Sequence, residues 1–115
     1  LRKKRVGMNE RTVLSAVMSK LRFHPDILWY SRLQSGRMGG YTLNPAGTPD
    51  VVAVVNQWDG CIAILFIEVK RPGKTTLDYE QRRFVTKMES KPKILCVVIN
   101  DPKQVNTYIK QAKDL

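Results

Sequence analysis

The chain has 115 residues, of which 43% are hydrophobic and 26% charged, and its formal net charge at pH 7 is +10. This length and composition predict one ordinary globular domain over residues 1–115. The longest apolar run, Cys61–Ile67, is far shorter than the roughly 20 residues of a membrane-spanning helix, and two cysteines exclude a disulfide framework.

Hydrophobic spacing, capping residues and turn signals predict the secondary structure in chain order. The predicted elements are a helix over 10–22 after an Asn9 N-cap, a strand over 27–33, a glycine-rich turn followed by a short strand over 41–43, strands over 51–55 and 61–70 joined by a turn, a helix over about 78–90, a strand over 94–99, and a last helix with Asp101 as N-cap and Pro102 at its first position. This order predicts an α/β fold with a mixed central sheet flanked by helices.

The N-terminal residues and the two cysteines bear on the expected location of the protein. Residues 1–7 are strongly basic and the first residue is not Met, so we expect a disordered or non-native basic tail, with Met8 as the natural start. No apolar segment of a signal peptide follows. Cys61 and Cys96 fall in apolar segments and are expected to be buried thiols. A reducing cytoplasm, prokaryotic or viral in origin, is the expected location.

The charge distribution points to a polyanionic partner such as nucleic acid. Residues 1–45 carry nine basic and two acidic residues, and residues 71–115 carry ten and five. The segment 46–70 between them is the one with a net negative charge, from Asp50, Asp59 and Glu68 against Lys70. This distribution is typical of a protein that binds DNA and holds a metal ion at its centre.

Two charged residues end the apolar strand over 61–70. Side chains alternate along a strand, so Glu68 and Lys70 share one face. The turn after residue 55 brings Asp50 beside the far end of this strand. Asp50 and Glu68 with the carbonyl of Val69 would supply hard oxygen ligands for Mg²⁺ or Mn²⁺, and Lys70 would offset charge on a phosphodiester. A solvated Glu–Lys pair is the simpler alternative for these two residues alone.

The combination of motifs resembles a known family. The matching segments are Gly47–Asp50, Phe66–Pro72, Glu80–Gln81 and, less closely, Arg32–Gly36. They are similar to the virus-type replication–repair nuclease (VRR-NUC) branch of the PD-(D/E)xK nuclease superfamily, over about residues 8–112. The resemblance implies the restriction-endonuclease-like αβββαβα core, an order that the sequence pattern gives independently.

The resemblance also implies roles for single residues. Asp50 and Glu68 become metal ligands, Lys70 the catalytic lysine, and Gln81 a catalytic residue near the metal or phosphate, with a surface helix glutamine as the alternative for Gln81. Glu10, which we place on the buried stripe of the first helix, is a further candidate ligand, with helix-dipole complementarity as the alternative. Apart from the resemblance, polar and basic residues around the site are candidate phosphate contacts, each with a solvated surface role as the alternative: Arg32, Ser35, Arg37, Arg71, Lys74, Arg82 and Arg83. Trp58 is expected to be exposed, free to pack on a partner or wedge into DNA.

The expected function is therefore a Mg²⁺- or Mn²⁺-dependent DNA endonuclease. Short stand-alone members of this branch resemble Holliday junction resolvases, which predicts a homodimer that acts on branched DNA. A flap or nicking nuclease within a larger complex, a non-catalytic nucleic-acid-binding module and a partner-binding structural domain are the alternatives. The last of these leaves the +10 charge unexplained.

Overall fold

The computed structural model describes residues 8–115, except for the side chains of residues 37, 38, 41 and 42. The expected tail over residues 1–7 lies outside this range. The elements are α1 (Glu10–Phe23), β1 (Ile27–Arg32), β2 (Arg37–Met38), β3 (Tyr41–Thr42), β4 (Val51–Asn56), β5 (Ile62–Val69), α2 (Tyr79–Glu89), β6 (Ile94–Ile99) and α3 (Gln104–Lys113).

A four-stranded sheet with the order β1-β4-β5-β6 forms the centre of the fold. The first three strands make an antiparallel meander, and β6 pairs parallel to β5. The predicted α/β class with a mixed sheet between helices is therefore confirmed. A small β2–β3 hairpin, of which the sequence indicated one strand, is inserted before β4.

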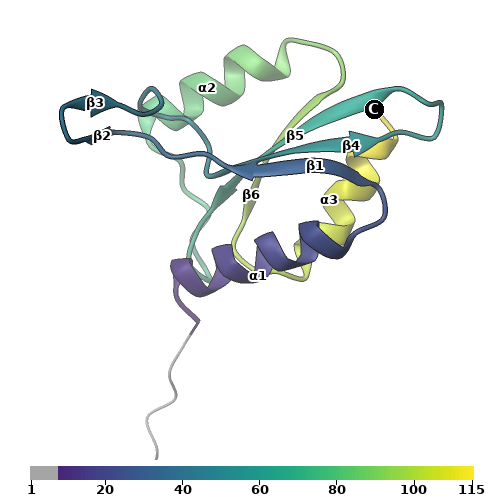
Figure 1. Ribbon diagram of the computed structural model, residues 1–115, viewed down its shortest axis with the longest axis horizontal. Helices are drawn as coiled ribbons and strands as arrows, with labels where there is room; N and C mark the ends of the chain where they lie inside the picture. The colour runs from purple at the N-terminus through teal and green to yellow at the C-terminus, as the bar shows by residue number, and fades with distance from the viewer. Residues whose placement is uncertain (1–7) are drawn as a thin grey trace, which may run out of the picture.

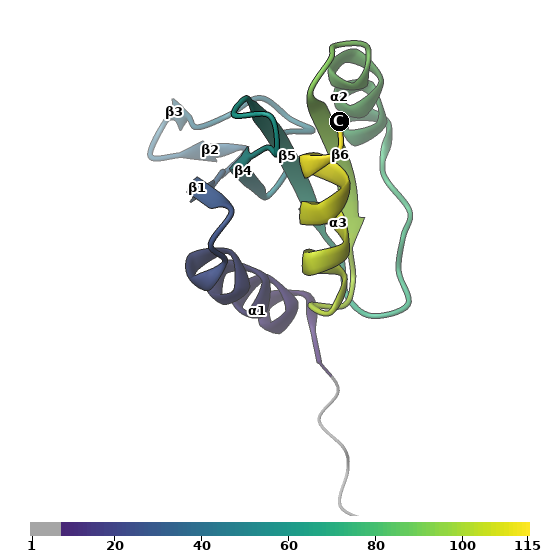
Figure 2. The same cartoon turned by 90° about the vertical axis from the view of Figure 1, so that its right-hand side faces the viewer.

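The sheet separates two helical layers. α1 and α3 lie together on one face and α2 covers the other (Figures 1 and 2). The core lies on the side of α1 and α3, where alternate side chains of β4 and β5, such as Val51, Leu65 and Ile67, are fully buried. The α2 layer is thinner, and Phe84 meets Phe66 of the sheet edge to face, with ring centroids 5.0 Å apart.

Local sequence explains where the helices begin. The Asn9 side chain accepts a hydrogen bond from the Thr12 N–H, so the predicted N-cap of α1 is confirmed. The predicted start of α3 is wrong: the Asp101 side chain accepts from the Lys103 N–H in a preceding turn, and the helix begins at Gln104. The Gln104 side chain accepts from the Asn100 and Asp101 N–H groups and stabilises that turn.

The predicted burial of the cysteines is correct only in part. Cys61 is exposed because it lies in the turn between β4 and β5. Cys96 is half-buried in β6, where burial and the nearby Glu89 raise the pKa of its thiol to about 11. No helix within residues 8–115 is long and apolar enough to span a membrane.

Candidate functional site

The meander brings the candidate residues to one end of the sheet. β4 and β5 pair with Val51 opposite Ile67, so one step further along the same register Asp50 lies opposite Glu68. The Asp50 carboxylate accepts a hydrogen bond of 2.7 Å from the Val69 N–H. The Asp50 carbonyl accepts another from Leu33, which ties the end of β1 to the start of β4. Asp50 is thus held between the last residues of two strands.

Glu68 and Lys70 project toward α2 and are almost entirely buried, each with 9% of its surface exposed. The Lys70 Nζ lies 3.8 Å from the Glu68 Oε1. This exposure excludes the simple alternative of a solvated pair at a strand end. Burying two charged groups is costly unless they are paired and hydrogen-bonded, so the fold maintains this pair against a free-energy cost.

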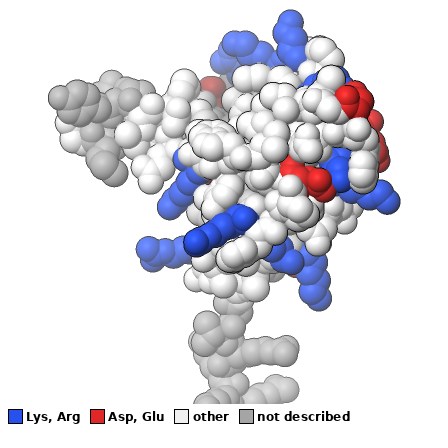
Figure 3. Space-filling model, turned by 45° about the vertical axis from the view of Figure 1, so that its right-hand side comes forward, with Lys and Arg blue, Asp and Glu red and all other residues white. Residues whose placement is uncertain are grey.

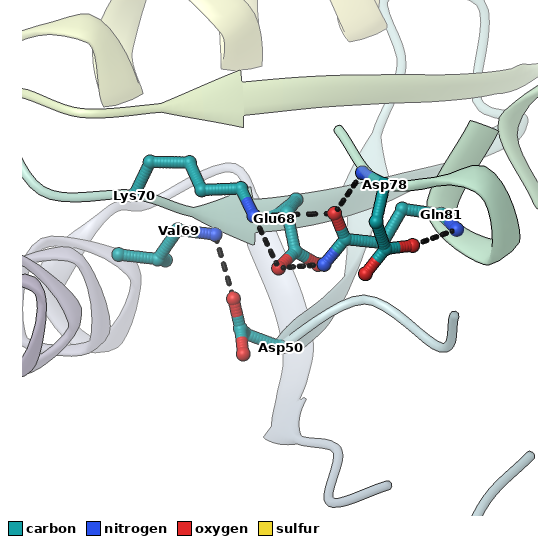
Figure 4. Close-up of polar contacts among 6 residues, drawn as sticks. All are labelled: Asp50, Glu68, Val69, Lys70, Asp78 and Gln81. Carbon is teal, nitrogen blue, oxygen red and sulfur yellow. Dashed lines mark hydrogen bonds and ion pairs between the residues drawn. The ribbon is translucent and has the colours of Figure 1, made fainter. Parts of the chain in front are cut away.

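Gln81 connects the pair to α2. Its Oε1 accepts hydrogen bonds from the Lys70 Nζ (3.1 Å) and the Asp78 N–H (2.9 Å), and its Nε2 donates to the Glu68 Oε1 (2.9 Å; Figure 4). In turn the Asp78 side chain accepts from the Gln81 N–H, which completes a capping box at the start of α2. The helix cap therefore fixes the amide that orients both charged side chains.

The pKa of Glu68 is raised from its ordinary value near 4.5 to about 8. Burial is the largest cause, and the neighbouring Asp50 carboxylate adds to it by repulsion and by a hydrogen bond that favours the protonated form. Lys70 opposes the rise, and the charge of Glu10 contributes slightly to it. Two neighbouring carboxylates with little access to water disfavour each other's ionisation. A divalent cation between them would supply the positive charge that allows both to ionise.

The donor set fits Mg²⁺ or Mn²⁺. Asp50 and Glu68 provide carboxylate oxygens and the backbone of Val69 provides a carbonyl at the same end of the sheet, and such hard ligands suit these ions. Within residues 8–115 no three or more His, Cys, Asp or Glu side chains form a group that would hold an ion. A cation here would therefore rely on two carboxylates and retain water, as Mg²⁺ commonly does.

The position of Glu10 differs from the prediction. Its side chain is exposed in the first turn of α1 and not buried on the inner stripe, because that stripe begins with Val13. Glu10 nevertheless lines a cleft of about 450 Å³ together with Asp50 and Val69. Its candidacy as a ligand stays a prediction.

The candidate DNA contacts separate into groups. Arg32 lines the same cleft as Asp50, and Ser35, Arg71 and Lys74 are exposed in the loops that follow β1 and β5. The backbone of Arg37 lies in β2, and its side chain is outside the described part of the chain. Arg82 donates to the Leu77 carbonyl and Arg83 pairs with Glu80 on the outer face of α2.

Trp58 is 71% exposed, as predicted, but it lies at the opposite end of β4 and β5 from Asp50. Its Nε1 donates to Asp114, and the Lys113 Nζ lies 3.4 Å from the centre of its ring. These contacts attach the β4–β5 turn to the end of α3. Within this structure Trp58 therefore packs against α3 and is remote from the candidate site.

Gly47 sets the distance between the loop before β4 and α2. Its φ is +86°, and a Cβ there would overlap the backbone of Glu80, lying 2.6 Å from the carbonyl carbon. Glu80 directly precedes Gln81. The sequence motif contained this glycine, but the contact that requires it depends on how α2 packs and has no signal in the sequence.

We expect Gly47→Ala to destabilise the protein and to impair any activity that depends on Gln81. The strained φ contributes about 1–2 kcal/mol, and the overlap with Glu80 adds about 1–3 kcal/mol. Gly60→Ala is the matched control, since Gly60 has a φ of +82° with open space around it. Urea unfolding of both variants measures the difference, and equal losses of stability would show that the Gly47–Glu80 contact is unimportant.

The four residues that converge here, Asp50, Glu68, Lys70 and Gln81, are all residues that the sequence motifs predicted. Two further residues were not predicted: Asp78, whose signal is the spacing of a capping box, and Arg11, which also lines the cleft beside Asp50. No family model matches this chain, and no curated protein matches it.

Proposed function

We propose that this chain is a metal-dependent DNA endonuclease of the VRR-NUC type within the PD-(D/E)xK superfamily. The observation that carries the proposal is the hydrogen-bonded group of Asp50, Glu68, Lys70 and Gln81 at the end of an apolar sheet, in which Glu68 and Lys70 are buried and Asp50 is half-buried. A module that only binds DNA has no use for two adjacent carboxylates, which repel phosphates.

Each residue has a distinct task in the proposed reaction. Asp50 and Glu68, with the Val69 carbonyl, would hold the Mg²⁺ or Mn²⁺ ion. When bound, the ion supplies Lewis-acid polarisation of the phosphodiester and a lowered pKa for water. Lys70 would place a positive charge near the phosphoryl oxygens, on which negative charge develops. Gln81 is a positioning residue, because it fixes both Lys70 and Glu68 through one amide.

The net charge of +10 supports DNA as the substrate. We further propose that the protein acts as a homodimer on branched DNA, since a twofold dimer would present two active sites to the two cleavage positions of a symmetric four-way junction. A flap or nicking nuclease in a larger complex is the second candidate within the same chemistry.

End-labelled four-way junction, flap, duplex and single-stranded DNA, incubated with Mg²⁺, Mn²⁺ or EDTA, test the proposal. We expect wild-type protein to cut at least one substrate with metal and none in EDTA. Asp50→Ala should lose cleavage at least about 10³-fold because it removes a metal ligand, while DNA binding in EDTA is retained or strengthened because a repelling carboxylate is removed. Paired symmetric cuts would support the resolvase form.

The negative outcomes are distinct. Metal-independent cutting, or full activity in Asp50→Ala, would contradict the site assignment. DNA binding without metal-dependent cleavage of any substrate would favour a binding module. A single cut at the branch of a flap would favour the second candidate.

A further inference from the structure

Asp50 separates two different surroundings. On its α2 side lie the buried Glu68 and Lys70 and the half-buried Gln81. On its α1 side lies the open cleft of about 450 Å³, formed where α1 and β4 begin and β1 and β5 end. Its lining residues are Glu10, Arg11, Leu14, Arg32, Asp50 and Val69. This volume is within the usual range for ligand sites, and the wall is charged.

The two arginines of the cleft have no side-chain partner within the described part of the chain. Among residues 8–115, neither Arg11 nor Arg32 takes part in an ion pair or a side-chain hydrogen bond, whereas Arg82 and Arg83 on α2 each have such a partner. Figure 3 shows that Lys and Arg side chains project from many parts of one face, so a positive charge alone does not mark a site. Two guanidinium groups on the wall of one cleft, without a partner among the described residues, do mark a site, because their planar donor groups match phosphate oxygens.

The charges of the cleft cancel in the absence of a cation. Arg11 and Arg32 contribute two positive charges, and Glu10 and Asp50 oppose them with two carboxylates. A divalent cation at Asp50 would leave the cleft with a net positive charge. Anion binding in the cleft is therefore expected to be coupled to metal binding, and the coupling is reciprocal.

We propose that this cleft is the binding site for the phosphodiester backbone of the substrate strand, with Arg11 and Arg32 contacting phosphates on the α1 side of Asp50. The strand then passes between the start of α1 and the end of β1. The proposal rests on the proposed function for the cation at Asp50. It adds Arg11 as a substrate-binding residue and gives the path of the DNA strand across the protein.

The test measures binding and not cleavage. Fluorescence anisotropy of a labelled DNA duplex is recorded over a range of salt concentrations, in Ca²⁺ and in EDTA, for Arg11→Ala and Arg32→Ala. Gel analysis verifies that the DNA stays intact. The matched control is Arg22→Ala, which removes the same charge from the other end of α1, where Arg22 lies over the Phe23 ring outside the cleft. Circular dichroism verifies that all three exposed substitutions leave the fold intact.

Each cleft variant should weaken binding several-fold in Ca²⁺, by less in EDTA, and should reduce the salt slope by about 0.9 because one phosphate contact is lost. Arg22→Ala should keep the wild-type affinity and slope. Unchanged salt slopes in both cleft variants, or an equal loss of affinity in Arg22→Ala, would overturn the proposal that the cleft binds the DNA backbone. A wild-type protein that does not bind DNA would overturn it as well. If instead the cleft variants behave as expected and no substrate is cut, the proposed enzyme fails and the binding site stands.

Discussion

Replacing Glu68 by glutamine should make the folded protein more stable and inactive. The pKa of Glu68 is raised to about 8 in the folded chain, and the group ionises near 4.5 when unfolded. Between these values the folded state binds one more proton, so this group lowers the free energy of unfolding as pH rises, by about 1.4 kcal/mol per unit. The stability that the protonated Glu68 contributes is fully present below pH 4.5 and is lost as pH rises through 8.

Glutamine has the same size as glutamate, and its carbonyl can still accept the hydrogen bond from the Gln81 Nε2. It carries no charge at any pH, so the cost of a buried carboxylate disappears. We expect Glu68→Gln to raise the free energy of unfolding by about 3 kcal/mol at pH 8.5, allowing for relaxation around a nearly buried group, and to have little effect near pH 4.5.

Urea unfolding in EDTA at both pH values measures this effect, and Glu89→Gln on the exposed face of α2 is the control. The same substitution removes a proposed metal ligand, so cleavage should fall at least about 10³-fold. A Glu68→Gln variant that is less stable than wild type at pH 8.5 would contradict the raised pKa. A variant that is stable and fully active would exclude Glu68 as a ligand.

The central part of the fold was predictable from local patterns. The apolar strands over β4 and β5 are separated by a short turn, which determines antiparallel pairing and hence the meeting of Asp50 with Glu68. The alternation of strand side chains placed Glu68 and Lys70 on one face. These relations depend on residues close in sequence, so the hydrophobic period and the turn were enough to find them.

The remainder depends on contacts between distant segments. The role of Gln81 as a bridge follows from how α2 packs on the sheet, and the position of Glu10 and Arg11 in an open cleft follows from where α1 begins beside the sheet. Hydrophobic spacing marks the buried face of a helix but gives no position along the sheet. Cys61 illustrates the same limit, because an apolar segment does not reveal that its first residue lies in the exposed turn before β5.

Replacing Lys70 by methionine should reduce the rate of cleavage strongly while the protein stays folded. The Lys70→Met substitution therefore separates the chemical role of Lys70 from its packing. Methionine fills a similar volume without charge, so the buried position stays filled. At neutral pH Glu68 is largely protonated in the metal-free protein, so removing Lys70 leaves no full buried charge behind. We therefore expect a change in unfolding free energy of less than about 1.5 kcal/mol, in contrast to the usual cost of breaking a buried ion pair.

Cleavage should respond very differently from stability. Without the ammonium near the phosphodiester, the rate should fall by about 10²–10³ at saturating Mn²⁺, the usual loss for one preorganised electrostatic contact. Saturating metal removes the effect of altered ion affinity from the comparison. Lys110→Met on the exposed face of α3 is the control and should keep the wild-type rate. Wild-type cleavage by Lys70→Met would remove the lysine from the mechanism, whereas a stable, DNA-binding and inactive variant would show that its charge acts on the reaction.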